Sequence, residues 1–235
     1  MEIRFCRVDI SSISPDSKCE VYLLHVQIKD IKERAEQMIN TILSRSWING
    51  LPSAIDRISY SARAERTIDK LANDVFKKVS TPISDEFGEY VVSMTAQDSL
   101  EIEMHHRKVP LAEMFKEKIS GNPGFDFHTE AQSNTIAFGE AKYSATDNPY
   151  TRALTQIIEF IELGKDTMEL TDLSRFVSGT AINKAIGGQK AYVAAFSINS
   201  TNYDLVFRNI LKSEYLKELL EYTEVYLIGV EIIDK

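Results

Sequence analysis

The stretch Gly124–Tyr143 constrains the fold of this chain more than any other segment, because it predicts two short antiparallel strands joined by a polar turn. Apolar and polar residues alternate in both halves, as they do in strands that have one buried face. In the first half, Phe125 and Phe127 are expected to share one face, with Asp126 on the other. The hairpin therefore carries polar chemistry on an otherwise apolar scaffold.

Three charged side chains in this hairpin indicate a metal site. Glu140 and Lys142 share one face of the second strand, and a register that places Glu140 beside Asp126 brings two carboxylates and one ammonium together. Neighbouring carboxylates repel, and a cation between them relieves the repulsion. Mg²⁺, with Mn²⁺ as a substitute, suits such a site because one or two carboxylates, waters and a substrate phosphate often hold it. With Lys142 orienting or deprotonating a water, this set predicts metal-assisted phosphodiester hydrolysis.

The remainder of the chain predicts an α/β protein in which helices cover a sheet. The segments with strand-like patterns are 1–10, 19–28, 100–106, 190–198 and 225–233. The segments with helical spacing are 30–52, 62–79, 110–119, 150–164, 171–187 and 213–222. Thr81-Pro82 breaks the chain, so residues 1–80 are expected to form an accessory α+β region and residues 81–235 the catalytic core.

The charge distribution argues against a chain that holds nucleic acid by itself. The net charge is −8; residues 1–80 contain 13 Lys and Arg against 11 Asp and Glu, and the remainder contains 14 against 24. Affinity for nucleic acid depends largely on Lys and Arg that neutralise phosphates. A bound metal, a local basic patch or a partner protein is therefore expected to supply the missing attraction.

The start of the chain and its two cysteines bear on the compartment. The first residues lack the uninterrupted apolar stretch of a signal peptide or membrane span, so we expect a cytoplasmic protein without a membrane partner. Cys6 and Cys19 lie in two segments that can pair as a hairpin. Free thiols are expected here rather than a disulfide or a metal site.

The polar residues of the hairpin resemble a known nuclease signature. Asp126, followed by Glu140-Ala141-Lys142, resembles the D…(D/E)-x-K pattern of the restriction-endonuclease-like, or PD-(D/E)xK, superfamily. The 14 positions from Asp126 to Glu140 are typical of a strand, a turn and a strand. The proline departs from the pattern, because Pro123 lies three residues before the aspartate. The resemblance implies a mixed sheet flanked by helices, Asp126 and Glu140 as Mg²⁺ ligands, and Lys142 as a catalytic residue.

Within this superfamily the chain looks most like HamA, the nuclease subunit of the Hachiman anti-phage defence systems, which works beside a separate helicase. The similarity covers residues 84–233 and includes a Phe-Gly-Glu-Tyr helix at 87–90, the Gly-Phe-Asp and Gly-Glu-Ala-Lys strands and a closing β-α-β segment. It implies DNA as the substrate and a helicase or ATPase as the protein partner.

The helix after Ser84 supplies a further candidate ligand. Ser84 is expected to cap it, with Asp85 and Glu86 in the first turn, where the helix dipole favours acids. In the superfamily the corresponding helix often contributes a glutamate to the metal site, and the resemblance assigns that role to Glu89. Glu86 is the rival, and a simple capping or surface acid is the alternative for both.

Two other polar residues lie near the expected site. Gln156, four residues before Phe160, resembles the Gln-x-x-x-Tyr element that some members place behind the active site, and it is assigned a supporting role. His128 shares parity with Asp126, so it is a candidate for positioning water or phosphate, and an edge-exposed histidine is the simpler interpretation.

Together these features predict a metal-dependent DNA nuclease, the effector of a bacterial anti-phage system that works with a helicase or ATPase. Two alternatives stay open. One is a nuclease fold without activity that holds a helicase or a DNA end. The other is an enzyme that uses the same three side chains on a non-phosphate substrate, whose activity would survive EDTA.

Overall fold

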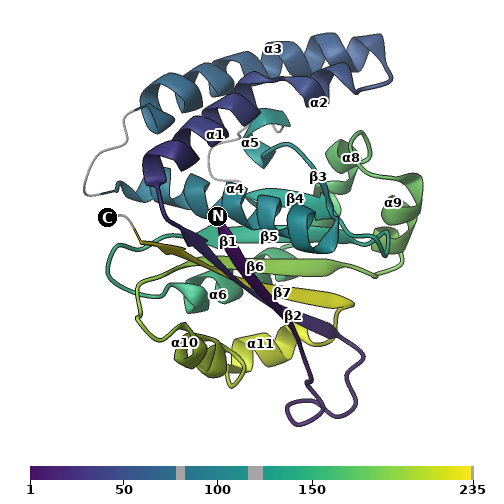
Figure 1. The fold of residues 1–235 in the computed structure, drawn as a ribbon. Coiled ribbons are helices and arrows are strands. Elements are labelled where there is room, and N and C mark those ends of the chain that lie inside the picture. The colour runs from purple at the N-terminus through teal and green to yellow at the C-terminus, as the bar shows by residue number, and fades with distance from the viewer. Residues whose placement is uncertain (78–82, 116–123, 234–235) are drawn as a thin grey trace.

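One seven-stranded mixed sheet organises the protein, as the computed structural model of residues 1–77, 83–115 and 124–233 shows (Figure 1). The strand order is β1-β2-β7-β6-β5-β4-β3. This arrangement confirms the expected α/β class with helices on both sides of a mixed sheet. The strands are Glu2–Val8 (β1), Glu20–Ile28 (β2), Arg107–Lys108 (β3), Phe127–Glu130 (β4), Ile136–Lys142 (β5), Ala191–Ile198 (β6) and Glu224–Ile232 (β7).

Four parallel strands form the centre of this sheet. β2, β7, β6 and β5 run in one direction, and β1, β4 and β3 add antiparallel edges. All eight residues of β6 are buried, as expected for a parallel strand with helices on both faces. The carboxyl ends of the parallel strands meet at one edge of the sheet, which is where open α/β sheets commonly bind ligands.

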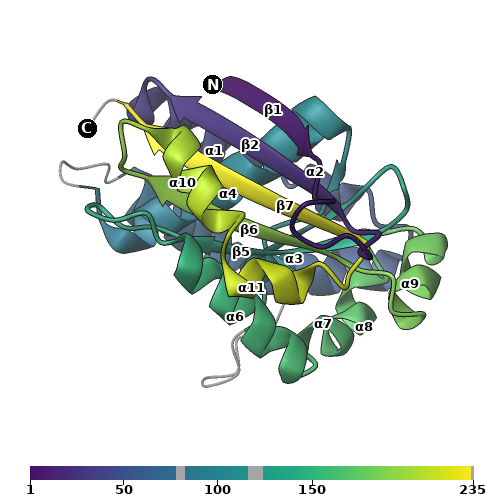
Figure 2. The ribbon, with the colours of Figure 1, turned by 90° about the horizontal axis from the view of Figure 1, so that it is seen from below.

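Two layers of helices cover the sheet (Figures 1 and 2). The first layer contains α1 (Ile31–Leu43), α2 (Ser46–Asn49), α3 (Ala54–Lys70), its π-helical continuation (Leu71–Phe76), α4 (Asp85–Met104) and α5 (Ala112–Phe115). The second contains α6 (Tyr150–Glu162), α10 (Tyr203–Ile210) and α11 (Glu214–Leu219). Three short helices, α7 (Lys165–Met168), α8 (Leu170–Leu173) and α9 (Gly179–Ile186), lie at one end of the sheet (Figure 2).

The N-terminal strands belong to the same sheet as the expected core. Both predicted N-terminal strands are present, and β2 pairs with β7 in parallel along nine residue pairs, from Glu20↔Glu224 to Ile28↔Ile232. Because β7 is buried almost throughout, it needs a hydrogen-bonding partner on each side, and β2 supplies one of them. The domain boundary near residue 80 stays a prediction, and it does not coincide with a break in the sheet.

The strand expected over Leu100–His106 is wrong. Ser84 caps α4 by accepting the Phe87 N–H at 3.3 Å, and the helix then continues to Met104. Leu100 is buried and Ile102 is 53% exposed, although a strand with one buried face would place them on the same side. The alternation in this stretch is therefore a coincidence at the end of a long helix, which stops at His105 in the left-handed conformation (φ 55°).

Several predicted helices differ in their bounds. The segment 30–52 divides into α1 and α2, and the segment 171–187 divides into α8 and α9. The helix expected over 62–79 begins at Ala54 because the Ser53 side chain accepts the Asp56 N–H, and its last residues lie outside the described ranges. The helix expected over 110–119 is present as α5, and residues 116–119 also lie outside these ranges. Among the described helices, none combines the length and apolar character needed to cross a membrane.

Close packing between α4 and the end of β5 can be tested at Gly88. A Cβ atom added there would lie 2.2 Å from Cγ of Tyr143, so the ring or the helix must shift. We expect Gly88→Ala to lower the free energy of unfolding by about 1–3 kcal/mol, measured by urea denaturation. Gly179→Ala is the control, because its added Cβ meets no atom within 4 Å. Equal stability of the two variants would contradict this packing.

Candidate metal and catalytic site

The β4–β5 hairpin brings Asp126 and Glu140 together. The ladder ends at the pair Phe127↔Gly139, directly before Asp126 and Glu140, and these two carboxyl groups interact electrostatically there. The Asp126 N–H donates to the Gly139 carbonyl at 3.0 Å, and Asp126 Oδ2 accepts the Ala141 N–H at 2.9 Å. The register on which the sequence argument depended is therefore present, and Asp126 is fixed by its main chain and its side chain.

The chain bends at Asp126, which the sequence pattern did not indicate. Phe127 packs against Gly139 on the α4 side of the sheet. Phe125 packs on the α6 side, with its ring centroid 5.3 Å from that of Phe138 and 5.2 Å from that of Phe160. The expectation that Phe125 and Phe127 share a face is therefore wrong, because regular alternation does not continue through the bend.

Glu140 is an acid in a position that disfavours its charge. Its residue surface is 1% exposed, Oε1 accepts a hydrogen bond from Nζ of Lys142 at 2.6 Å, and the buried Oε2 accepts none. Burial raises the pKa of Glu140 well above its usual value, the charge of Asp126 adds to this, and Lys142 opposes it. Burial therefore disfavours the charged form of Glu140, and a cation beside it would offset that cost.

The two neighbours of Glu140 respond to the same environment. Burial raises the pKa of Asp126, although the Ala141 N–H and the Lys142 charge oppose the rise. Burial alone would lower the pKa of Lys142, but the charge and hydrogen bond of Glu140 outweigh it, so the net pKa is raised. Lys142 is therefore an ammonium paired with Glu140.

These groups fit a hard divalent cation. Two adjacent carboxyl groups, one with a buried oxygen that accepts no hydrogen bond, offer the oxygen ligands that Mg²⁺ takes. The described parts of the chain contain no group of three His, Cys, Asp or Glu side chains arranged to hold a metal. Water, main-chain carbonyl or substrate oxygens would therefore complete the coordination, as is common for Mg²⁺.

Glu89 and Glu86 occupy different surroundings on α4. Glu89 is half-buried; burial raises its pKa, the charge of Lys142 lowers it and that of Asp126 raises it. Glu86 is exposed and its Oε1 accepts from Nζ of Lys70 at 2.6 Å. Because Glu89 interacts with the charges of Lys142 and Asp126, it is favoured over Glu86 as the acid that α4 contributes to this site. The role of Glu89 as a metal ligand stays a prediction.

The other two candidates, Gln156 and His128, lie in different surroundings. Gln156 is half-buried on α6, the helix that packs on β5 and β6. Its supporting role stays a prediction. His128 is completely buried, with Nε2 2.6 Å from Oε2 of Glu169, so the edge-exposed position expected for it is wrong.

Two residues that the sequence analysis missed, Glu169 and Gln97, bond the chain on both sides of Asp126. Glu169 Oε1 accepts the Phe125 N–H at 3.0 Å, while its Oε2 contacts His128. Gln97 donates from its side-chain amide to the carbonyls of Val109 and His128 at 2.7 and 3.1 Å. Gln97 could have been found as a polar residue within the buried part of a long helix. The role of Glu169 could not be predicted from the residues around it, because its partners lie more than 40 residues away in the sequence.

Cys6 and Cys19 are free thiols, as expected. Cys6 is exposed and Cys19 is buried, and the strand register places Leu23, rather than Cys19, opposite Cys6. Burial raises the pKa of Cys19 to about 12, so its thiolate is strongly disfavoured. Neither cysteine contributes to the carboxylate site.

Glu140→Gln tests the cation site without an activity assay. Because the folded-state pKa of Glu140 lies above its unfolded value, the native state retains a proton that the unfolded chain releases. This contribution to stability therefore declines as pH rises from the unfolded-state pKa toward the raised folded-state pKa. Glu140→Gln should reduce that decline. Mg²⁺ should raise the melting temperature of the wild type by mass action and leave Glu140→Gln nearly unchanged. Glu214→Gln, whose parent side chain is 79% exposed, is the control. An equal Mg²⁺ shift in all three proteins would argue against a site at Glu140.

Comparison with known proteins places this geometry in a family. A search of curated proteins found no match. The family model described as HamA matches residues 2–235, nearly the whole chain, and thus includes every strand of the sheet and both acids of the hairpin. The HamA resemblance seen in the sequence is confirmed, whereas membership in the wider PD-(D/E)xK superfamily stays a prediction. The chain therefore belongs to the HamA family.

Proposed function

We propose that this protein is a Mg²⁺-dependent DNA nuclease, the effector subunit of a Hachiman defence system that works with a helicase or ATPase. Membership in the HamA family indicates a component of such a system. The observation that carries the nuclease assignment is the buried carboxylate of Glu140, placed beside Asp126 with one oxygen that accepts no hydrogen bond. A site that tolerates this arrangement gains from a cation more than an ordinary surface pair does.

Each residue of the site has a distinct task in the proposed reaction. Bound Mg²⁺ would supply Lewis acidity, which polarises a phosphodiester and lowers the pKa of a bound water. Asp126 and Glu140 would hold the ion, and the Ala141 N–H keeps the Asp126 carboxylate oriented. Lys142 is an ammonium, which supports a role in orienting the attacking water and offsetting phosphate charge rather than one in removing a proton.

The charge of the chain supports the need for a partner. With a net charge of −8, the protein has a weak general attraction for a polyanion. A motor protein that holds the substrate and presents it to the carboxylate edge of the sheet would supply that attraction. DNA is the substrate that the family assignment favours, and RNA serves as the comparison substrate in the assay.

The reaction can be tested by nicking of supercoiled plasmid. Glu140→Ala, Asp126→Asn and Lys142→Met should each lower the rate by at least about 100-fold, and EDTA should abolish cleavage by the wild type. Glu214→Gln should cleave like the wild type. The assay is repeated with a co-purified partner, with and without ATP, because the nuclease is expected to need a partner that delivers its substrate. Cleavage that survives EDTA would contradict the metal mechanism. An inactive wild type that keeps its Mg²⁺ thermal shift would favour the non-catalytic subunit.

The helix acid can be tested separately. Glu89→Gln removes a half-buried charge that interacts with Asp126 and Lys142, so it should raise the Mg²⁺ concentration needed for half-maximal cleavage by about 10- to 100-fold. Glu86→Gln removes an exposed partner of Lys70 and should leave the Mg²⁺ titration within about twofold of the wild type. The reverse ranking would assign the helix acid to Glu86.

A further inference from the structure

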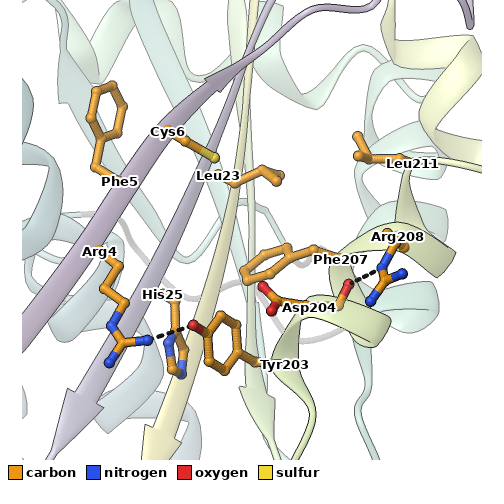
Figure 3. Close-up of a pocket in the computed structure, with 10 residues that line it drawn as sticks. All are labelled: Arg4, Phe5, Cys6, Leu23, His25, Tyr203, Asp204, Phe207, Arg208 and Leu211. Carbon is orange, nitrogen blue, oxygen red and sulfur yellow. Dashed lines mark hydrogen bonds between the residues drawn. The ribbon is translucent and has the colours of Figure 1, made fainter.

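A cleft of about 480 Å³ lies between β1, β2 and α10, away from the carboxylate hairpin (Figure 3). Its volume is within the range of ligand sites in proteins. Arg4 and Cys6 of β1 and Leu23 and His25 of β2 form one side. The other side is α10, from which Tyr203, Asp204, Phe207 and Arg208 face the strands, with Leu211 just beyond it.

The cleft and the candidate metal site share one row of the sheet. The strand registers connect the following residues across five adjacent strands: Lys142, Phe196, Gly229, His25 and Arg4. Strands lie about 4.8 Å apart, so four steps separate the two ends by about 19 Å. A nucleic-acid strand advances about 3.4 Å per nucleotide in a duplex, so a strand that joins the two ends has at least about six nucleotides between them.

Both sites also lie toward the same face of the sheet. His25 stacks on Tyr203 of α10, and Phe196 contacts Phe207 of the same helix. Lys142 has the parity of Phe138, which packs in the α6 side of the core. The middle of the row is covered, because Phe196 is fully buried and contacts Tyr150 of α6 and Phe207 of α10. One extended ligand that reaches both places must therefore run over the outside of these two helices.

A stacked aromatic pair and a polar atom without a partner form the base of the cleft. The rings of His25 and Tyr203 are stacked, with centroids 4.0 Å apart and an interplanar angle of 19°. His25 is 3% exposed and its Nε2 lies 3.0 Å from Oε2 of Glu231, an acceptor, so Nε2 donates. Burial lowers the pKa of His25, which leaves Nδ1 as an acceptor, and within the described structure this atom has no hydrogen-bond partner.

Two exposed guanidinium groups flank the aromatic base. Arg4 donates to the Tyr203 hydroxyl and lies 5.5 Å from the ring centroid. Arg208, one turn further along α10, donates from Nε to the Asp204 carbonyl at 3.3 Å, so its terminal nitrogens stay available. Aromatic faces between cations are the combination that binds single-stranded nucleic acid, because bases stack on rings and phosphates pair with Arg.

We propose that this cleft is a second nucleic-acid subsite, which takes a base and its flanking phosphates from the strand whose scissile phosphate reaches Asp126 and Glu140. The inference rests on the proposed nuclease function for its choice of ligand. The geometry assigns the base to the surface of Tyr203 and the phosphates to Arg4 and Arg208. The subsite would set the length and direction of the strand across the sheet edge, a task that the small carboxylate site cannot perform alone.

Binding in EDTA tests the subsite without cleavage. Fluorescence anisotropy with labelled single-stranded DNA and RNA of about 20 nucleotides should show at least about tenfold weaker binding for Arg4→Ala/Arg208→Ala than for the wild type. Arg7→Ala/Lys18→Ala is the matched control, since it removes the same charge from β1 and the following loop. Arg7 lies on the other side of β1 from Arg4, where it pairs with Glu20. Circular dichroism melting checks that both double variants are folded.

A second measurement, the fluorescence of a base analogue, tests whether a base stacks on Tyr203. A 2-aminopurine placed along the oligonucleotide should be quenched at one position, at least about six nucleotides from the position that is cut, and Tyr203→Leu should remove the quenching. Equal binding by the two double variants, or no quenched position, would overturn the subsite. Unchanged oligonucleotide affinity with loss of a co-purified protein partner would overturn it in favour of protein docking on β1. Cleavage of a small phosphodiester tests Asp126 and Glu140 alone, so failure of the nuclease proposal is distinguishable from failure of the subsite.

Discussion

Burying Glu140 beside Asp126 costs free energy, because two carboxyl groups in a poorly hydrated position cannot both ionise cheaply. Lys142 offsets part of that cost through its ion pair with Glu140, and a proton or a divalent cation must offset the rest. The surrounding structure makes the arrangement persist. The β4–β5 pairing, the Ala141 N–H and the bend at Asp126 all hold the two acids in place against their mutual repulsion.

Contacts from both faces of the sheet support that hairpin. From the α4 side, Gln97 donates to the carbonyls of Val109, directly after β3, and of His128 in β4, and Phe127 fills the space that a side chain at Gly139 would occupy. From the opposite side, Glu169 holds the Phe125 N–H and contacts His128. A strand of four residues has few backbone hydrogen bonds of its own, so these side-chain contacts account for much of its order.

The pairing of β2 with β7 unites the two ends of the chain. It places the carboxyl ends of four parallel strands along one edge, with the acid pair near one end and the β1–α10 cleft near the other. Because α6 and α10 cover the strands between the two places, the single strand that we propose as ligand would pass over the outside of these helices to reach both. The acidity of the chain is compatible with this arrangement when local cations and a partner provide the attraction.

The sequence alone determined the features that depend on local period and composition. The 124–143 hairpin, the helix cap at Ser84, the strands β6 and β7 and the grouping of Asp126, Glu140 and Lys142 follow from alternation, turn chemistry and a recognisable signature. The sequence analysis failed where alternation matched the wrong element, as at Leu100, or where it was interrupted by a bend, as at Phe125.

Only the tertiary structure decided which distant segments meet. It joined β2 to β7, brought Glu169 to Phe125, distinguished the surroundings of Glu89 from those of Glu86 and opened a cleft between β1 and α10. The physical reason is that a periodic pattern tells which side of an element is buried but not what buries it. Contacts between residues separated by 40 to 200 positions depend on how all the layers pack at once, and no local stretch encodes that outcome.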